Sequence, residues 1–240
     1  MSLFSNLFGH KPTAPAYPSD ELTINGKTLK LTFFAHASLA IEYKGRVIYL
    51  DPVSGNADYG TLPKADIILV SHSHYDHFDM EAIEAIQRPD TRILLDKTSA
   101  EGFGGDCYTM LPGAVAEPFD DIRVEAIAAY NTSDNQLQFH PKEREDCGYV
   151  VTLGSAVRIY LSGDTEPTPE MLALKGIDIA FLATNQPYTM KPEQAVEAVK
   201  ALRPAIFYPY HYGQVDEPTD VEALAKMLDG VCDVRIRPLA

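Results

Sequence analysis

The residues with the clearest chemical potential form one short run, in which three histidines and one aspartate occur within six positions. The run is His72-Ser73-His74-Tyr75-Asp76-His77, and it follows the continuously apolar segment 67–70. Imidazole nitrogens and carboxylate oxygens are ligands that zinc and other divalent ions bind in proteins. A solvated polar turn at the end of a buried strand would not need so many of them. The spacing therefore predicts a metal site in which His72 and His74 bind one ion, while Asp76 and His77 point toward a second.

Two more ligand candidates stand at the ends of other apolar segments. Asp164 follows residues 159–163, and Gly163 allows the turn that would let the carboxylate bridge two ions. His211 follows residues 206–210 and would complete the ligands of the second ion. Each residue alone would more often cap a helix or make a structural hydrogen bond, but their joint placement after separate strands favours a shared site. Two divalent ions are therefore predicted, with zinc the best match to these ligands and manganese, iron or nickel as alternatives.

The chemistry expected of such a site is hydrolysis. Two cations about 3.5–4 Å apart would hold a bridging water as hydroxide, because each bound ion lowers the pKa of that water. The hydroxide would attack a carbonyl or phosphoryl centre of a small-molecule ester, lactone or phosphodiester. Asp76 is the expected catalytic residue, since a ligand that also accepts a hydrogen bond from the water can move its proton. The alternatives are an iron-dependent oxidoreductase and a non-enzymatic sensor of metal or small ligands, although a sensor would not need both Asp76 and Asp164.

The segments that position these residues alternate in type along the chain. Asn25-Gly26 and Lys44-Gly45 lie between short apolar segments and predict the tight turns of a β-meander. After the histidine run, Asp79 caps a predicted helix whose apolar residues recur on one face. Strands and helices then alternate, which predicts two sheets packed face to face with helices on both outer sides. We expect further strands at 92–95, 122–128, 149–153, 157–161, 177–182, 205–210 and 231–236, and helices at 168–176, 192–202 and 220–228.

The bulk composition describes an acidic chain of ordinary core size. The 240 residues carry a net charge of −14, which repels nucleic acid and anionic membranes, so a small-molecule substrate is the expected partner. A cytoplasmic location is expected, because no segment has the apolar length of a membrane span and the start lacks a secretion signal. Residues 1–20 form a predicted extended lead-in to a single domain at 21–240. The apolar start of this lead-in, residues 1–9, would pack either on the body of the same chain or on a second copy of the chain. The second arrangement would give a homo-oligomer.

Several motifs together resemble the metallo-β-lactamase superfamily, in the branch that contains the ascorbate-6-phosphate lactonase and related bacterial and archaeal hydrolases. The resemblance extends from residue 31 to the C-terminus. It implies a four-layer αββα sandwich, of class α/β, with the site at the edge between the two sheets. It also makes Asp51 an acid that fixes the orientation of a ligand. The motifs are Phe34-Ala35-His36-Ala37-Ser38, Leu50-Asp51-Pro52, the run from His72 to His77, Ser162-Gly163-Asp164-Thr165 and Pro209-Tyr210-His211-Tyr212-Gly213.

This chain departs from the superfamily pattern at one ligand of the first ion. The superfamily has a third histidine just after the strand that corresponds to residues 122–128. Here that place holds Tyr130-Asn131, and the next histidine is His140. Either His140 reaches back from its loop, or Asn131 binds the ion through its oxygen, which suits metals harder than zinc. The residues expected around the metals, where they would support a ligand or contact substrate, are His36, Tyr188 and Tyr212.

Overall fold

The computed structural model describes residues 16–240, so the predicted apolar start at 1–9 and most of the lead-in lie outside the described residues. The first strand begins at Ser19, slightly before the predicted end of the lead-in. Tyr17 already contacts the body of the protein. Its ring packs edge-on against Phe34 with a centroid distance of 4.9 Å, and its hydroxyl accepts the backbone N–H of Asp58. The last residues before the first strand are therefore held on the first sheet.

The first seven strands form one mixed sheet in which sequence order is also spatial order. Strands β1 to β4 run antiparallel, which confirms the predicted meander, and strands β4 to β7 run parallel. Asn25 and Gly26 both adopt left-handed φ angles, 49° and 73°, as a two-residue hairpin turn requires. The strands are β1 (Ser19–Ile24), β2 (Lys27–Ala35), β3 (Ser38–Tyr43), β4 (Arg46–Leu50), β5 (Ile67–Val70), β6 (Arg92–Asp96) and β7 (Tyr108–Met110).

The other seven strands form a second mixed sheet, whose spatial order runs from β14 at one edge to β8 at the other. Its antiparallel part extends from β8 to β11 and its parallel part from β11 to β14. The strands are β8 (Val115–Phe119), β9 (Ile122–Ala128), β10 (Cys147–Leu153), β11 (Val157–Leu161), β12 (Ile179–Ala183), β13 (Ile206–Tyr210) and β14 (Asp233–Val234).

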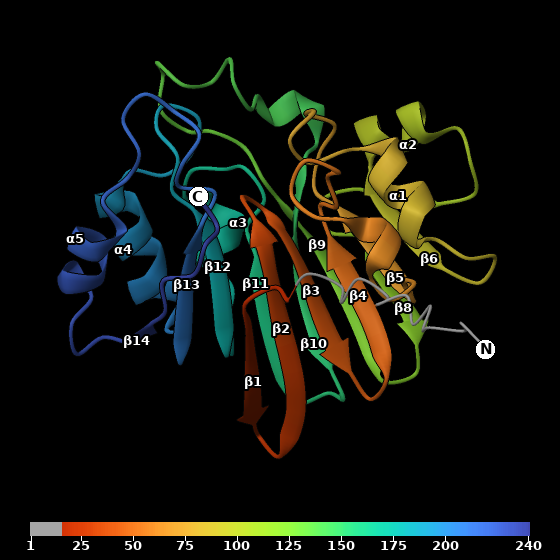
Figure 1. Ribbon diagram of the computed structural model, residues 1–240. Coiled ribbons are helices and arrows are strands. Elements are labelled where there is room, and N and C mark those ends of the chain that lie inside the picture. The colour runs from red at the N-terminus through yellow and green to blue at the C-terminus, as the bar shows by residue number, and fades with distance from the viewer. Residues whose placement is uncertain (1–15) are drawn as a thin grey trace, which may run out of the picture.

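Helices cover the outer face of each sheet, so the predicted four-layer αββα arrangement is confirmed (Figure 1). The largest apolar core lies between the sheets, where Leu31 and Leu69 of the first meet Tyr149 and Phe181 of the second. Two further apolar clusters lie under the helices on either side. The first sheet carries α1 (Met80–Ile86) and α2 (Lys97–Phe103), and the second carries α3 (Pro169–Leu172), α4 (Pro192–Leu202) and α5 (Val221–Met227).

The predicted elements agree best with the structure where the local signal is strong. The helix 192–202 and the strands 122–128 and 157–161 have the predicted bounds. The helix that Thr168 caps was expected to reach residue 176 but ends at Leu172, and the last strand is only Asp233–Val234. In both places few residues support the element, and the chain changes direction early.

The sequence does not indicate α2, β7 or β8. Helix α2 contains a glycine and begins at a cap, since the Asp96 side chain accepts the N–H groups of Thr98 and Ser99. Strand β8 contains Pro118, which suits its place at the edge of the second sheet because proline cannot donate to a neighbouring strand.

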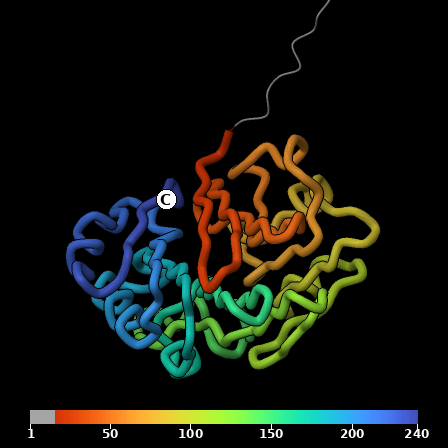
Figure 2. The backbone as a smooth tube through the Cα atoms, turned by 90° about the horizontal axis from the view of Figure 1, so that it is seen from below, coloured from red at the N-terminus to blue at the C-terminus, as the bar shows by residue number. Residues whose placement is uncertain are grey.

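The first strand and the end of the chain lie side by side (Figure 2). Arg237 donates hydrogen bonds of 2.8 Å to both carboxylate oxygens of Asp20 on β1. The Tyr208 hydroxyl of β13 donates to the same carboxylate at 2.6 Å. One carboxylate thus links the first sheet to the second.

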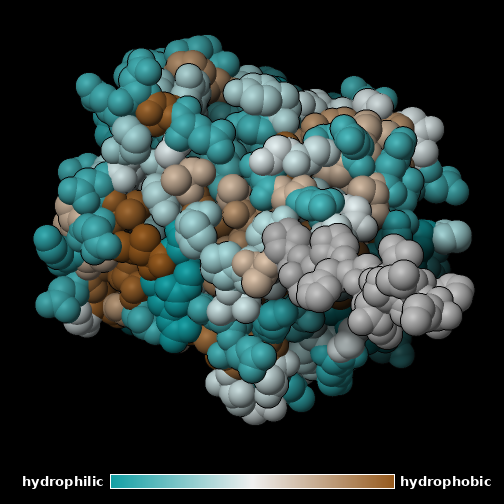
Figure 3. All heavy atoms as spheres, in the orientation of Figure 1, coloured by the Kyte–Doolittle hydropathy of each residue, from teal (hydrophilic) through white to brown (hydrophobic). Residues whose placement is uncertain are grey.

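The surface is polar over most of the face shown in Figure 3, with apolar side chains gathered on the side where α5 and β14 lie. Among residues 16–240, no helix combines the length and the apolar character that crossing a membrane requires.

Candidate metal centre

Six histidines and two aspartates come together at the edge between the two sheets. They stand in the β2–β3 turn, in the loop after β5, in the loop between β9 and β10, and shortly after β11 and β13. Their side chains form overlapping groups in which one ligand atom of each residue lies within 4.8 Å of all the others. The groups are His72, His74 and His140; His36, Asp76, His77 and His211; and His72, His77 and Asp164.

The first group joins the histidine run to the β9–β10 loop. His72 Nε2 lies 3.1 Å from His74 Nδ1. The His140 ring centroid is 5.1 Å from that of His72 and 5.0 Å from that of His74. His140 itself is buried, with 1% of its surface exposed. The loop therefore brings a third imidazole to the pair, although this chain has Asn131 at the sequence position where the superfamily pattern has a histidine.

Asn131 holds this loop in place. Its Nδ2 donates to the backbone oxygens of Gln136 at 3.1 Å and Tyr188 at 2.7 Å. Its backbone N–H donates to the carbonyl of His140 at 2.8 Å. These bonds use the amide nitrogen of Asn131 to tie two loops together and place His140 next to the other histidines.

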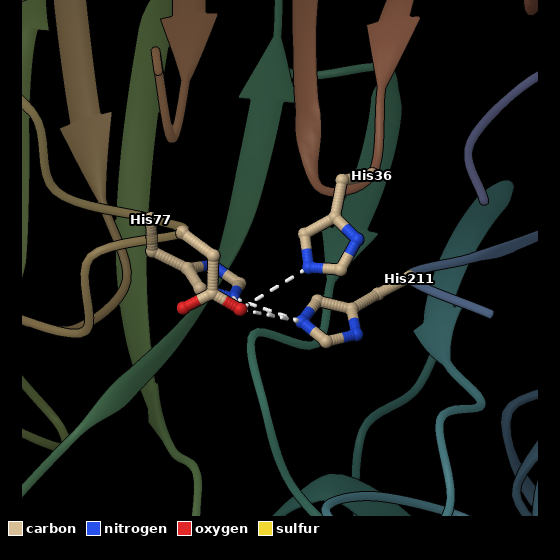
Figure 4. Close-up of side chains that lie close together, drawn as sticks. His36, His77 and His211 are labelled. Carbon is tan, nitrogen blue, oxygen red and sulfur yellow. Dashed lines mark hydrogen bonds and ion pairs between the residues drawn. The ribbon is translucent and has the colours of Figure 1, made fainter. Parts of the chain in front are cut away.

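The second group draws on three different segments. His77 Nε2 lies 3.1 Å from His211 Nε2, and Asp76 Oδ2 lies 3.5 Å from the same His211 nitrogen. His36 Nε2 is 3.2 Å from Asp76 Oδ2, and its ring lies against that of His211 with a centroid distance of 3.6 Å. Figure 4 shows His36 and His211 next to each other, with His77 facing them. Nitrogen and oxygen ligand atoms thus converge on one small volume.

Asp164 lies between the two groups. Its Oδ1 is 3.4 Å from His77 Nε2, while its Oδ2 is 3.2 Å from His211 Nε2 and 3.5 Å from His140 Nε2. The turn that delivers it needs Gly163, whose φ is +61° and where a Cβ would lie 2.8 Å from the backbone oxygen of Cys147. One carboxylate therefore lies within 3.5 Å of candidate ligand atoms from both groups.

Asp51 holds His77 in place through the ring nitrogen that does not face the other candidate ligands. Its Oδ2 lies 2.8 Å from His77 Nδ1, and its two oxygens accept the backbone N–H and the hydroxyl of Ser71, each at 2.7 Å. With Nδ1 held in this way, His77 presents Nε2 to the centre. The Ser71 hydroxyl also lies 3.0 Å from His72 Nδ1. The sequence indicated Asp51 but gave no signal for Ser71.

Arg144 and Asp146 form a second supporting pair that the sequence did not indicate. Arg144 Nη1 is 2.6 Å from His74 Nε2, and its Nε donates to Asp146 at 3.2 Å. Asp146 Oδ2 in turn lies 3.6 Å from His140 Nδ1. Both residues stand in the β9–β10 loop, where no local pattern marks them as neighbours of the histidine run.

The electrostatics of the first group favour the neutral imidazole. Burial, reinforced by the imidazole of His77, holds the pKa of His72 well below its usual range. Burial and the neighbours His140 and Arg144 lower the pKa of His74 to about 4. Both side chains are therefore uncharged at neutral pH, which is the form that binds a metal ion.

Asp164 and the neighbouring His77 of the second group favour their charged forms. Burial disfavours the ionised form of Asp164, but the imidazoles of His211 and His77 outweigh it and hold the pKa of Asp164 well below its usual range. Burial likewise opposes the charged form of His77, but Asp164 and Asp51 outweigh it and raise the pKa of His77 well above its usual value. Asp164 and His77 therefore favour each other's charged forms at neutral pH.

A cavity of about 360 Å³ opens beside both groups. Asp76, which is 23% exposed, faces it, and so does Tyr188. Tyr212 was expected near the pocket but turns away from it, because its hydroxyl donates to the backbone oxygen of Arg237 and its ring packs against the core between the sheets. The lining residues are His36, His74, Tyr75, Asp76, Gln138, Phe139, His140, Asp164, Asn185, Tyr188, His211, Gln214 and Val215.

Comparison with known proteins places this architecture in a family. Residues 30–211 match the beta-lactamase superfamily domain. A UPF0173 metal-dependent hydrolase from Thermococcus kodakarensis is 30% identical over 195 residues, which cover 77% of this chain and 84% of the relative. A crystal structure from Parabacteroides distasonis, described as that of a candidate metal-dependent hydrolase, is 42% identical and superimposes with a TM-score of 0.87, covering 94% of this chain and 100% of that one.

A more distant structure shares the fold. Igni18, a metallo hydrolase from Ignicoccus hospitalis, has a TM-score of 0.72 at 22% identity, covering 88% of this chain and 96% of that one. The family match, the relative and the ligand groups agree with one another. The chain belongs to the metallo-β-lactamase superfamily and, within it, to the UPF0173 family of metal-dependent hydrolases.

Proposed function

We propose that the protein holds two divalent metal ions and hydrolyses a small-molecule ester, lactone or phosphodiester. The observation that carries this proposal is the position of Asp164, whose oxygens lie within 3.5 Å of ligand atoms from both groups. The residues proposed to bind the first ion are His72, His74 and His140, those proposed for the second are Asp76, His77 and His211, and Asp164 would bind both.

The donor atoms fit such ions. Asp164 Oδ1 is buried without a hydrogen-bond partner in the described part of the chain, although a buried carboxylate oxygen normally has one. His77 Nε2 and His211 Nε2 face each other at 3.1 Å, and the Asp164 carboxylate lies within 3.4 Å of both nitrogens. A cation shared by these atoms would satisfy all of them at once.

Divalent ions in this place would polarise the carbonyl or phosphoryl group of a substrate and lower the pKa of a coordinated water. The residues of the chain then have separate tasks. Asp76 faces the cavity and is the proposed proton acceptor, and His36 holds its carboxylate in position from 3.2 Å away. Asp51 keeps His77 turned toward the centre. The cavity wall places the substrate against this constellation.

The ligand types favour zinc. Imidazole nitrogens predominate in the first group, and zinc binds imidazole and carboxylate readily in sites with few ligands. The second group offers more carboxylate oxygen, which manganese or iron would also accept.

The direct test is metal analysis of protein purified without added metal, followed by turnover assays with aryl esters, lactones and phosphodiesters. We expect about two metal ions per chain and at least one hydrolysed class, with turnover lost after chelation and restored by zinc or manganese. Tyr212→Phe is a matched control, because Tyr212 contacts the core and not the cavity. Full turnover by metal-stripped protein would contradict the proposal, and a coloured iron-containing protein inactive on all three classes would favour the oxidoreductase.

A further inference from the structure

The cavity beside the ligand groups does not end at the metal centre. A second hollow of about 790 Å³ adjoins it, and the two share Tyr188, Gln214 and Val215 as lining residues. The second hollow lies between the loop that follows β12 and the loop that follows β13, with Asp216 and Glu217 in its wall. A ligand bound at the ligand groups can therefore extend past Tyr188 toward these two acids.

The wall of the first cavity is built from aromatic rings and amides. Phe139 and Tyr188 pack edge to face with a centroid distance of 4.9 Å, and 38% of the Tyr188 surface remains exposed. Tyr75, within the histidine run, is 89% exposed although its neighbours are ligand candidates. The packed pair of Phe139 and Tyr188 can contact flat apolar groups by stacking and edge contacts, and the exposed ring of Tyr75 lines the same cavity.

One amide provides a polar contact within this wall. Asn185 is 3% exposed and lines the cavity. Its Nδ2 lies 3.1 Å from His211 Nδ1, while its Oδ1 has no hydrogen-bond partner among the described residues. The wall at this point is therefore an uncharged amide that lies against His211.

The charges of the residues that line the two hollows disfavour a ligand with an anionic group far from the metal centre. Of the described residues that line either hollow, none is lysine or arginine. Arg144 is near the centre but is directed to His74 and Asp146. Phosphate and carboxylate groups in proteins usually bind arginine or lysine, and here a remote anion would meet Asp216 and Glu217 instead.

We propose that the substrate carries a flat, uncharged group next to the bond that is cleaved, and that its far end is neutral or cationic but not anionic. The flat group lies among Tyr75, Phe139 and Tyr188, and the far end points to Asp216 and Glu217. This inference rests on the proposed function and selects within it: neutral or cationic esters and lactones are favoured over substrates that bear a remote phosphate or carboxylate.

The test uses three benzohydroxamates that differ only in the para substituent: tert-butyl, trimethylammonium and carboxylate. The hydroxamate binds metal in all three, and the first two substituents have nearly the same shape. Their Kd values are measured by calorimetry on the protein as purified, with its metal. We expect the carboxylate to bind about 5–20-fold more weakly than tert-butyl and trimethylammonium to bind at least as tightly, with the differences shrinking as salt is added.

Variants test whether the residues that line the two hollows cause these differences in Kd. The double change Asp216→Lys and Glu217→Lys, at two exposed loop positions, should reverse the order so that the carboxylate binds more tightly than trimethylammonium. Glu84→Lys is the control, since Glu84 is exposed on α1 and lines neither hollow, and it should leave the ratios unchanged. Tyr188→Ala should weaken the three compounds equally while leaving acetohydroxamate, which has no ring, unaffected.

The outcomes separate this inference from the proposed function. A protein that contains no metal and binds no hydroxamate contradicts both. A protein that binds all three compounds with equal Kd, or whose ratios survive the double lysine variant, keeps the metal centre but overturns the inference about substrate. A metal-containing protein that binds acetohydroxamate and none of the three aryl compounds also overturns it, because the aromatic wall would then exclude the ring it is proposed to accept.

Discussion

Replacing His140 with alanine is the sharpest test of how the first metal ion is bound. His140 provides the third imidazole of its group, and its Nε2 lies 3.5 Å from the carboxylate proposed to bridge the two ions. Loss of even an outer ligand partner lowers metal affinity about 10–100-fold, so loss of a direct donor should cost at least about 1.4–2.7 kcal/mol of binding free energy. Under a competing chelator, the metal content of His140→Ala should fall from about two ions per chain toward one.

Asn131→Ala is the matched comparison, because it changes the same loop without removing an imidazole. The amide donates to two backbone carbonyls, those of Gln136 and Tyr188. The Gln136 carbonyl also accepts the N–H of Phe139, so among the described residues only the Tyr188 carbonyl is left without a donor, at a cost of about 1–3 kcal/mol of folding free energy. For a chain of this length, each kcal/mol lowers Tm by roughly 2–4 °C. Asn131→Ala should therefore unfold at a lower temperature than the natural protein. It should lose less metal than His140→Ala, because the imidazole of His140 is still present although its loop is held less firmly.

The assay combines metal analysis after dialysis against a chelator of known affinity with thermal unfolding of the metal-free proteins. Cobalt substitution adds a spectroscopic reading, since loss of one imidazole from the first ion changes the visible bands. The reasoning is refuted if His140→Ala keeps two tightly bound ions while Asn131→Ala loses one. In that case Asn131 is the ligand, and a metal harder than zinc is the better assignment.

Three further outcomes are expected. Asp164→Ala should abolish hydrolysis and weaken the binding of both ions, and metal titration of a variant that still binds two ions tightly would contradict its bridging role. Hydrolysis should decline as the pH falls toward about 4, the lowered pKa of His74, because protons then compete with metal for its imidazole, and a rate that stays unchanged from neutral pH down to about pH 3.5 would show that His74 is not a ligand. Burial disfavours the ionised form of Asp20, but the Tyr208 and Arg237 hydrogen bonds outweigh it and lower its pKa. The stabilisation that Asp20 provides is therefore complete above the ordinary carboxylate pKa and is lost as the pH falls through the lowered value. In Asp20→Asn, the unfolding free energy measured in urea should change less with pH between about pH 3 and pH 5 than it does in the natural protein. Equal pH dependence in the two proteins would refute this role of Asp20.

Much of the fold follows from local patterns because each pattern has one physical solution. The apolar run at β5 must be buried on both faces, and it is, because the second sheet covers one face and helix α1 covers the other. Asp79 does cap α1, since its side chain accepts the N–H groups of Glu81 and Ala82. Such a signal is missing in β7 and β8. These strands form because each pairs with the free edge of its neighbouring strand, and a local sequence pattern does not indicate a pairing of this kind.

The candidate site was predictable to the extent that its residues follow strands. The run from His72 to His77 stands directly after β5, and His211 directly after β13. The path of the β9–β10 loop could not be derived in this way, because tertiary hydrogen bonds such as those of Asn131 decide where it folds. For the same reason Arg144 gave no signal, although it lies 2.6 Å from His74.

The backbone itself marks the site in a way that composition does not. His36, Asp51 and His211 adopt φ angles of 54°, 43° and 52°, in the left-handed region that residues other than glycine enter infrequently, asparagine, aspartate and histidine more often than the rest. Each such conformation is expected to cost on the order of 1 kcal/mol or more, and it persists only where the surrounding structure imposes it. All three follow strands of the central sheets, and all three direct a side chain to one ligand group or its support. A chain selected only for stability would place glycine or asparagine at these turns. Six other described non-glycine residues, among them Lys44 and Arg203, also adopt positive φ angles, so it is the convergence of these three side chains, and not the left-handed backbone alone, that ties the turns to the site.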